Sequence, residues 1–134
     1  MILIYNNLMN SSINIGSKQY LVKKVYSELA KQKGLQGIDR LEDNEGMLFC
    51  YEHPQNVAFW MKGVNIPLDI IFINSDYIVT KVVEAKPNDE TLIAEAEVLY
   101  VLEVNANSGI VEGDELDLEE EGPVMKVLFP DGSE

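Results

Sequence analysis

The sequence predicts one small, mainly β domain with a single α-helix, folded as a barrel or half-barrel of largely antiparallel strands. Three observations predict this class. The chain has 134 residues, 46% of them apolar, which suits one domain with one core. A clear helical period of apolar residues occurs over residues 17–34. After Gly46, short apolar runs are separated by Gly, Pro, Asn and Asp, a pattern typical of strands and turns.

The helix is predicted over residues 17–34 and is expected to pack across one opening of the barrel. Its apolar residues recur at spacings of three and four and form one stripe: Leu21, Val22, Val25, Tyr26 and Leu29. The lysines of the segment fall mainly on the other face. Ser17 is expected to cap the start of the helix and Gly34 its end.

The remaining elements are predicted strands joined by short connections, which favours antiparallel neighbours. The expected strands are 47–52, 57–62, 67–73, 77–85, 92–104, 115–119 and 123–129. Residues 1–6 are interpreted as another strand, since no basic region precedes them and the apolar run is too short for an export signal. Residues 130–134 are expected to be a frayed tail. The whole chain, 1–134, is predicted to form one domain.

Composition restricts the function classes. The net charge is −13, from 23 acidic and 10 basic residues. A phosphate backbone needs clustered Lys and Arg, so direct nucleic-acid binding is not expected. No uncharged apolar run is long enough to cross a bilayer. Cys50 is the single cysteine and cannot form an internal disulfide, which indicates a reducing compartment. We expect a soluble protein that is cytoplasmic or virus-associated.

Three ordered segments, 44–49, 59–62 and 66–73, carry a resemblance to a known family. They read Asn-Glu-Gly-Met-Leu-Phe, Phe-Trp-Met-Lys and Ile-Pro-Leu-Asp-Ile-Ile-Phe-Ile. Together with 100–106 and the following Gly113-Asp114, they resemble the domain-of-unknown-function family numbered 192, over about residues 20–120. The resemblance implies a compact barrel-like β domain with a helix and no assigned activity. Many relatives carry export signals, so their expected absence here points to an intracellular or virus-borne protein.

Asp69 is the first candidate site residue, because it shares a strand face with Ile71 and Ile73. If residues 63–66 form a hairpin loop, Trp60 lies opposite Asp69, and Lys62 lies nearby. We hypothesise that Trp60, Lys62 and Asp69 line a concave wall that binds a planar or cationic small ligand. The alternative is structural: Asp69 accepts hydrogen bonds from backbone amides, and Trp60 fills space.

Glu103 is the second candidate, because it shares a strand face with Leu99 and Val101. Two carboxyl groups perform acid and base catalysis only within several ångströms of each other, and the sequence does not place Glu103 near Asp69. No catalytic residue, cofactor or metal site is predicted. Cys50 is interpreted as a buried apolar residue, and His53 has no second His or Cys nearby.

An acidic segment follows, in which leucines alternate with charged residues. Gly113-Asp114 is expected to form a tight turn, with Gly113 at positive φ and the Asp114 carboxylate accepting turn amides. The simplest interpretation of the segment is a solvated strand face. The alternative is a surface that binds a basic protein partner. Its residues would be Glu112, Glu115, Asp117, Glu119, Glu120 and Glu121.

Three functions remain open. The favoured one is a non-enzymatic accessory or structural module that acts through protein contacts, in a larger assembly such as a virus particle. It rests on the lack of a catalytic motif and on the acidic face. The second is a small-ligand binder or enzyme that uses Trp60 and Asp69. The third is a mimic of DNA charge that occupies a DNA-binding protein.

Overall fold

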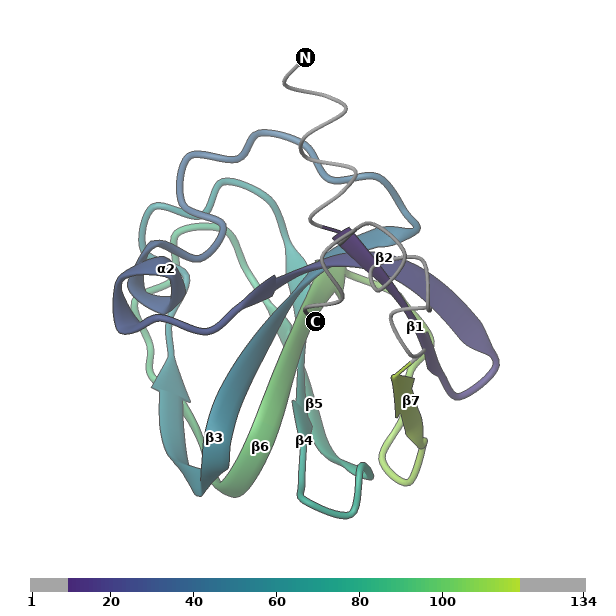
Figure 1. The fold of residues 1–134 in the computed structure, drawn as a ribbon. Helices are drawn as coiled ribbons and strands as arrows, with labels where there is room; N and C mark the ends of the chain where they lie inside the picture. The colour runs from purple at the N-terminus through teal and green to yellow at the C-terminus, as the bar shows by residue number, and fades with distance from the viewer. Residues whose placement is uncertain (1–9, 119–134) are drawn as a thin grey trace, which may run out of the picture.

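The computed structural model describes residues 10–118 of the chain. Figure 1 shows a strongly curled sheet with one short helix beside it. In chain order the elements of this range are β1 (Asn10–Ile15), β2 (Lys18–Val25), α2 (Glu28–Lys33), β3 (Glu45–Phe59), β4 (Leu68–Ile73), β5 (Val79–Ala85), β6 (Ile93–Asn105) and β7 (Leu116–Leu118). The predicted class, a mainly β half-barrel with one helix, is confirmed. The same range contains no helix with the length and hydropathy of a membrane span.

The strands form one seven-stranded sheet in the order β5-β4-β6-β3-β2-β1-β7. Neighbouring strands are antiparallel except for β2 and β3, which run parallel. The two ends of the sheet also approach each other. The Val79 amide donates to the Asp114 carbonyl at 2.9 Å, and the Leu116 amide donates to the Tyr77 carbonyl at 2.8 Å. These bonds draw the sheet into a half-barrel that is closed at one corner.

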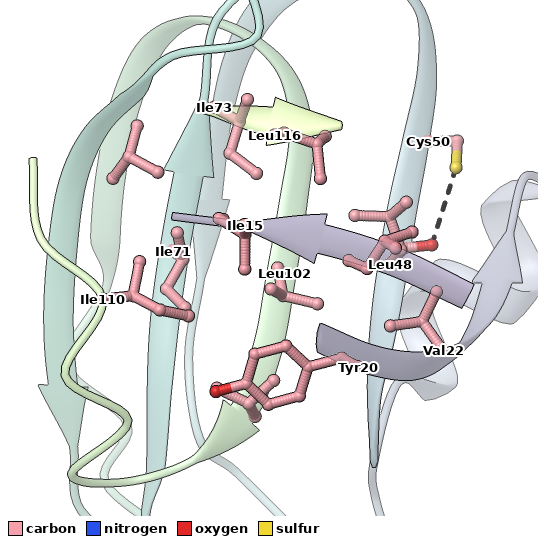
Figure 2. Packing of buried hydrophobic residues seen from close by; sticks show 13 residues of the cluster. Ile15, Tyr20, Val22, Leu48, Cys50, Ile71, Ile73, Leu102, Ile110 and Leu116 are labelled. Carbon is pink, nitrogen blue, oxygen red and sulfur yellow. Dashed lines mark hydrogen bonds between the residues drawn. The ribbon is translucent and has the colours of Figure 1, made fainter. Parts of the chain in front are cut away.

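Apolar side chains from every strand fill the concave side of the sheet and form the first cluster. Figure 2 shows them converging from facing strands. Burial of each large member contributes about 1.5–3 kcal/mol. The first cluster consists of Ile13, Ile15, Tyr20, Val22, Leu48, Cys50, Ile71, Ile73, Val79, Leu102, Val104, Ile110 and Leu116.

The second cluster covers the other face of the sheet. It consists of Val25, Leu35, Met47, Phe49, Met61, Val64, Leu68, Ile70, Phe72, Ala85, Val98 and Val101. The far halves of β3 and β6 cover much of it, because register shifts between Cys50 and Val57 bend the pair. Phe59 thereby reaches the cluster, with its ring centroid 5.0 Å from that of Phe49 and 6.0 Å from that of Phe72. Both faces of the sheet are therefore buried around β4, whose residues are all buried.

Gly46 allows β3 and β6 to approach closely beside Glu103 and Val104. A Cβ atom at this position would lie 2.7 Å from the Glu103 carbonyl oxygen and 2.8 Å from Val104 Cγ1. Gly46 is paired with Val104 in the ladder, so any larger residue would push the two central strands apart.

The predicted helix over residues 17–34 is wrong for most of its length. Residues 18–25 form strand β2, and helix α2 covers only Glu28–Lys33. Ser17 belongs to a two-residue hairpin turn, in which Gly16 has a φ of 57°, and it caps no helix. Gly34 does end the helix, as predicted.

The residues themselves explain the error. Tyr20 and Val22 alternate with exposed neighbours and point into the first cluster, which is a strand period. Three of the five residues in the predicted helical stripe, Leu21, Tyr26 and Leu29, are in fact exposed. Pairing with β1 and β3 decided the outcome, and β1 was not predicted at all.

The strands predicted after Gly46 are confirmed with one change of extent. The expected strands 47–52 and 57–62 are joined in one bent strand, β3, which ends at Phe59, so residues 60–62 lie beyond the strand. Strands β4, β5, β6 and β7 lie within their predicted ranges, to within one residue at the ends. The predicted strands at 1–6 and 123–129, and the tail at 130–134, lie outside the described residues.

Candidate functional site

Glu103 lies near the end of β6, on the face that carries the second cluster. It is paired with Met47 of β3 and Ile70 of β4, which both belong to that cluster. It shares this face with Val101, as the sequence predicted. Only 4% of Glu103 is exposed, so the acid is buried within an apolar layer.

The carboxyl group of Glu103 has no hydrogen-bond or ion-pair partner among residues 10–118. Every fully enclosed side-chain oxygen or nitrogen in that range does have a partner. The carboxyl oxygens must therefore reach open space, and they do so in a cavity of about 430 Å³. We call it the Glu103 cavity. The residues that matter to its chemistry are Lys31, Lys33, Phe59, Trp60, Lys62 and Glu103.

Burial determines the protonation state of this acid. Desolvation raises the pKa of Glu103 from 4.5 to about 8. At neutral pH the carboxyl group is therefore mainly uncharged, and it can donate one hydrogen bond as well as accept others. An uncharged carboxylic acid at the bottom of a cavity offers a polar contact to a ligand without repelling an anion.

Helix α2 forms one wall of the Glu103 cavity. The helix starts because the Ser27 hydroxyl accepts a hydrogen bond from the Ala30 amide at 3.1 Å, and it ends where the Gly34 amide donates to the Ala30 carbonyl. Lys31 Nζ lies 3.8 Å from a Glu28 carboxylate oxygen and 3.9 Å from the centroid of the Tyr51 ring. The wall therefore presents cationic side chains to the cavity.

Trp60 and Lys62 also line the cavity and follow immediately after β3. The Met61 amide donates to the Asp89 carbonyl at 2.8 Å, and this bond anchors the chain between the two residues. Lys62 Nζ is 5.4 Å from the centroid of the Trp60 ring, and 43% of Trp60 is exposed. Three of the four predicted ligand-binding residues, Trp60, Lys62 and Glu103, therefore line one cavity.

Asp69 is not part of this cavity, and the predicted hairpin that placed it opposite Trp60 is wrong. Strands β3 and β4 are not neighbours, because β6 lies between them. Asp69 is paired instead with Glu84 of β5 and Val104 of β6. Short connections suggested adjacent strands, but β3 pairs with β6 along both of its halves.

Asp69 has a structural role on the face of the first cluster. It shares that face with Ile71, as predicted, and its Oδ2 accepts hydrogen bonds from the Ser108 amide at 2.9 Å and the Ser108 hydroxyl at 2.6 Å. The bonds hold the loop that carries Ile110 into the cluster. Because Asp69 pairs with the residue after Glu103, the two acids point to opposite faces and form no catalytic pair.

Replacement of Asp69 by Ala should lower the free energy of unfolding by about 1–3 kcal/mol, because the partly buried Ser108 amide and hydroxyl lose their acceptor. Urea unfolding followed by circular dichroism measures this loss. In a double-mutant cycle with Ser108→Ala, the second change should cost much less in the Asp69→Ala background than alone. Fully additive losses would contradict the assigned contact.

The remaining predicted residues have plain structural explanations. Cys50 is buried, its thiol donates to the Leu48 carbonyl, and burial raises the pKa of the thiol, which together fit an apolar role. His53 is exposed on β3. Gly113 has a φ of 94° and the Asp114 carboxylate accepts from the Val111 amide at 3.0 Å, so the predicted turn is confirmed.

The acidic segment is only partly described. Glu112, Glu115 and Asp117 are exposed, whereas Glu119, Glu120 and Glu121 lie outside the described residues. The outward direction of the three described acids fits a solvated strand face. Their role in binding a partner remains a prediction.

Sequence reasoning did not connect α2 with Glu103. Lys31 and Lys33 were placed on the polar face of the predicted helix, and Phe59 within a predicted strand, but nothing in the sequence joins these segments across β6. The one sequence feature that pointed to the cavity was the position of the acidic Glu103 within an apolar run. An acid there requires either a partner or access to a cavity.

The fold and the cavity together define the chain as a small β half-barrel domain with a buried acid at the base of a cavity. Residues 11–118 match the model of the DUF192 family, which is described as Uncharacterized ACR, COG1430. The chain belongs to this family, as its signature segments predicted.

Two solved structures are similar to the chain over 81% of its length. One is a protein of unknown function from Novosphingobium aromaticivorans DSM 12444, with 31% identity, a TM-score of 0.77 and 84% of its own chain covered. The other, from Sinorhizobium meliloti 1021, is named as a candidate transcription regulator, with 28% identity, a TM-score of 0.78 and 93% covered. Among curated proteins, none matches the sequence.

Proposed function

We propose that this chain is a small-ligand-binding module and that the Glu103 cavity is its binding site. The observation that carries the proposal is the Glu103 carboxyl group, which is 4% exposed, has no partner among the described residues and opens onto the cavity. Burial of an unpaired polar group costs free energy. A bound ligand that completes the hydrogen bonding of Glu103 would recover that cost.

The size and lining of the cavity support the same function. Its volume of about 430 Å³ falls in the range of roughly 300–1,000 Å³ typical of small-molecule sites. Phe59 and Trp60 supply aromatic surface, while Lys62 and Glu103 supply polar contacts at its rim and base. Such sites combine an apolar lining with a few polar groups that orient the ligand.

A thermal-shift screen of small metabolites tests the proposal, with Trp60→Ala as the site variant. A ligand at 100 times its Kd should raise the stability of the parent by about 2.7 kcal/mol. In Trp60→Ala the same compound should give a clearly smaller shift, because the aromatic wall is removed. Leu92→Ala is the matched control, since Leu92 is also exposed, at 66%, and is not a cavity residue. Equal shifts in all three proteins would rule out this cavity.

A protein-interaction role remains a second proposal, carried by the exposed acids Glu112, Glu115 and Asp117. It includes the accessory-module and charge-mimic functions expected from the sequence. Association through this surface should weaken as salt concentration rises, because screening removes the attraction. Neither the fold nor the comparisons support a virus particle as the setting.

The regulator named among the similar structures is compatible with a ligand-sensing module. In this chain, regulation would act through ligand or protein contacts, because the net charge of −13 disfavours contact with a phosphate backbone.

A further inference from the structure

The charged residues around the Glu103 cavity differ from those of the chain as a whole. The chain has 23 acidic and only 10 basic residues. The cavity is nevertheless lined by Lys31 and Lys33 of α2 and by Lys62, which follows β3. Besides Glu103, Glu28 is the acid among the described lining residues. Cationic groups are thus concentrated around the cavity of an otherwise acidic protein.

These lysines do not neutralise Glu103. Within residues 10–118, no basic side chain lies within 4.0 Å of its carboxyl oxygens. Lys31 is held by Glu28 and by the face of the Tyr51 ring. Tyr51 also interacts electrostatically with Glu103. Desolvation, with smaller effects from Glu28 and Glu103, raises the pKa of Tyr51 to about 12, so it is uncharged at neutral pH.

The acid at the base of the cavity is therefore uncharged at neutral pH, while the walls are positive. A cationic ligand would face the lysine side chains and would need Glu103 to ionise in an apolar layer. An anionic ligand would be attracted by the lysines and could accept a hydrogen bond from the Glu103 carboxyl group. The charge distribution thus favours an anion over a cation. Of the planar or cationic ligand expected when Asp69 was placed in the site, the cationic alternative is therefore disfavoured.

We propose that the Glu103 cavity binds a small organic anion with an apolar body. The apolar body packs on Phe59 and Trp60, and the anionic group faces Lys33 and Lys62. An oxygen of the ligand accepts a hydrogen bond from Glu103. Carboxylates and phosphate monoesters both have this chemistry. This inference rests on the proposed ligand-binding function and specifies the class of ligand. It also assigns Glu103 as a donor.

A series of compounds with one phenyl body tests the charge preference directly. Phenylacetate, phenylacetamide and phenethylamine are anionic, neutral and cationic, and phenyl phosphate separates phosphate from carboxylate recognition. Isothermal titration calorimetry on the parent protein should give the highest affinity for one of the two anions and the lowest for the amine. Lys62→Gln should weaken binding of the anions a few-fold and leave the affinity for phenylacetamide unchanged.

The role of Glu103 is tested by pH, with Glu103→Gln as the matched variant. In the parent, the affinity for the anion should fall about tenfold per pH unit above about pH 8, because the ionised carboxylate no longer donates and repels the ligand. Glutamine keeps a donor and cannot ionise, so the variant should bind the anion within a few-fold of the parent at neutral pH and lose this pH dependence. Circular dichroism checks that both variants are folded.

Two kinds of result are distinguishable. Binding of the amine or the amide with no binding of either anion would overturn the anion assignment and keep the ligand-binding function. No binding of either anion by a folded parent protein would also overturn the assignment. The proposal of a ligand-binding function is overturned only by a separate result, namely that the stability shifts in the metabolite screen are the same in the parent and in Trp60→Ala.

Discussion

Glu103→Gln should make the protein more stable than the parent at alkaline pH and should remove a large part of its pH dependence. The pKa of Glu103 is raised from 4.5 to about 8 by burial, so the folded state holds a proton that the unfolded chain releases above pH 4.5. The stabilising contribution is fully present below that pH and is lost as the pH rises to about 8. At about 1.4 kcal/mol per pH unit, the upper bound of the loss is roughly 5 kcal/mol.

Urea unfolding of both proteins between acidic and alkaline pH measures this difference. The two free energies should lie close together near pH 4.5 and diverge up to about pH 8, with the variant above the parent. The difference between the two free energies of unfolding isolates the contribution of Glu103, since the two proteins share all other acids. Glu112→Gln is the control, because Glu112 is exposed and its variant should follow the parent curve. Parallel curves for Glu103→Gln would mean that the buried acid is not held in its protonated form.

Phe72→Ala is the substitution with the largest expected loss among the apolar residues. Phe72 is 0% exposed and lies on β4, with Phe59 packed edge-on against it at 6.0 Å between ring centroids. Removal of the ring leaves a cavity between the sheet and its folded-back end, which should cost about 3–5 kcal/mol. The midpoint of urea unfolding should fall by a corresponding amount with little change in slope.

Leu29→Ala provides the comparison for Phe72→Ala. Leu29 is 79% exposed on α2, so its replacement should change the free energy of unfolding by no more than about 0.5 kcal/mol. Similar losses for the two variants would contradict the placement of the second cluster.

The strands after Gly46 were predictable because their apolar runs, turn residues and family signature agree. The segment 18–25 was not, because the three-residue spacing of Val22 and Val25 fits a helical period, whereas in strand β2 these two side chains point to opposite faces of the sheet. What selected the strand was pairing with Ser11 and Ser12 on one side and with β3 on the other. The pairing with β3 is distant in sequence and leaves no local signal, whereas the pairing with β1 closes on the two-residue turn of Gly16 and Ser17, a hairpin signal that the helical period masked.

Three residues of the candidate site could be predicted from the sequence, but their arrangement in space could not. Trp60, Lys62 and Glu103 were identified, since aromatic, cationic and buried acidic residues stood out in apolar strands. Asp69 was grouped with them through the assumption that consecutive strands are neighbours. Insertion of β6 between β3 and β4 separated Asp69 from Trp60 and brought Glu103 beneath α2.

The meeting of the two ends of the sheet has a consequence for self-association. An outermost strand with unpaired amides and carbonyls is a template for intermolecular pairing and fibril growth. Here Val79, at the start of β5, both donates to Asp114 and accepts from Gly113, so part of that strand is already occupied within the molecule. Further along, Lys81 donates to the Ala94 carbonyl and places a charge on the same strand. The curvature of the sheet therefore also protects the protein against aggregation.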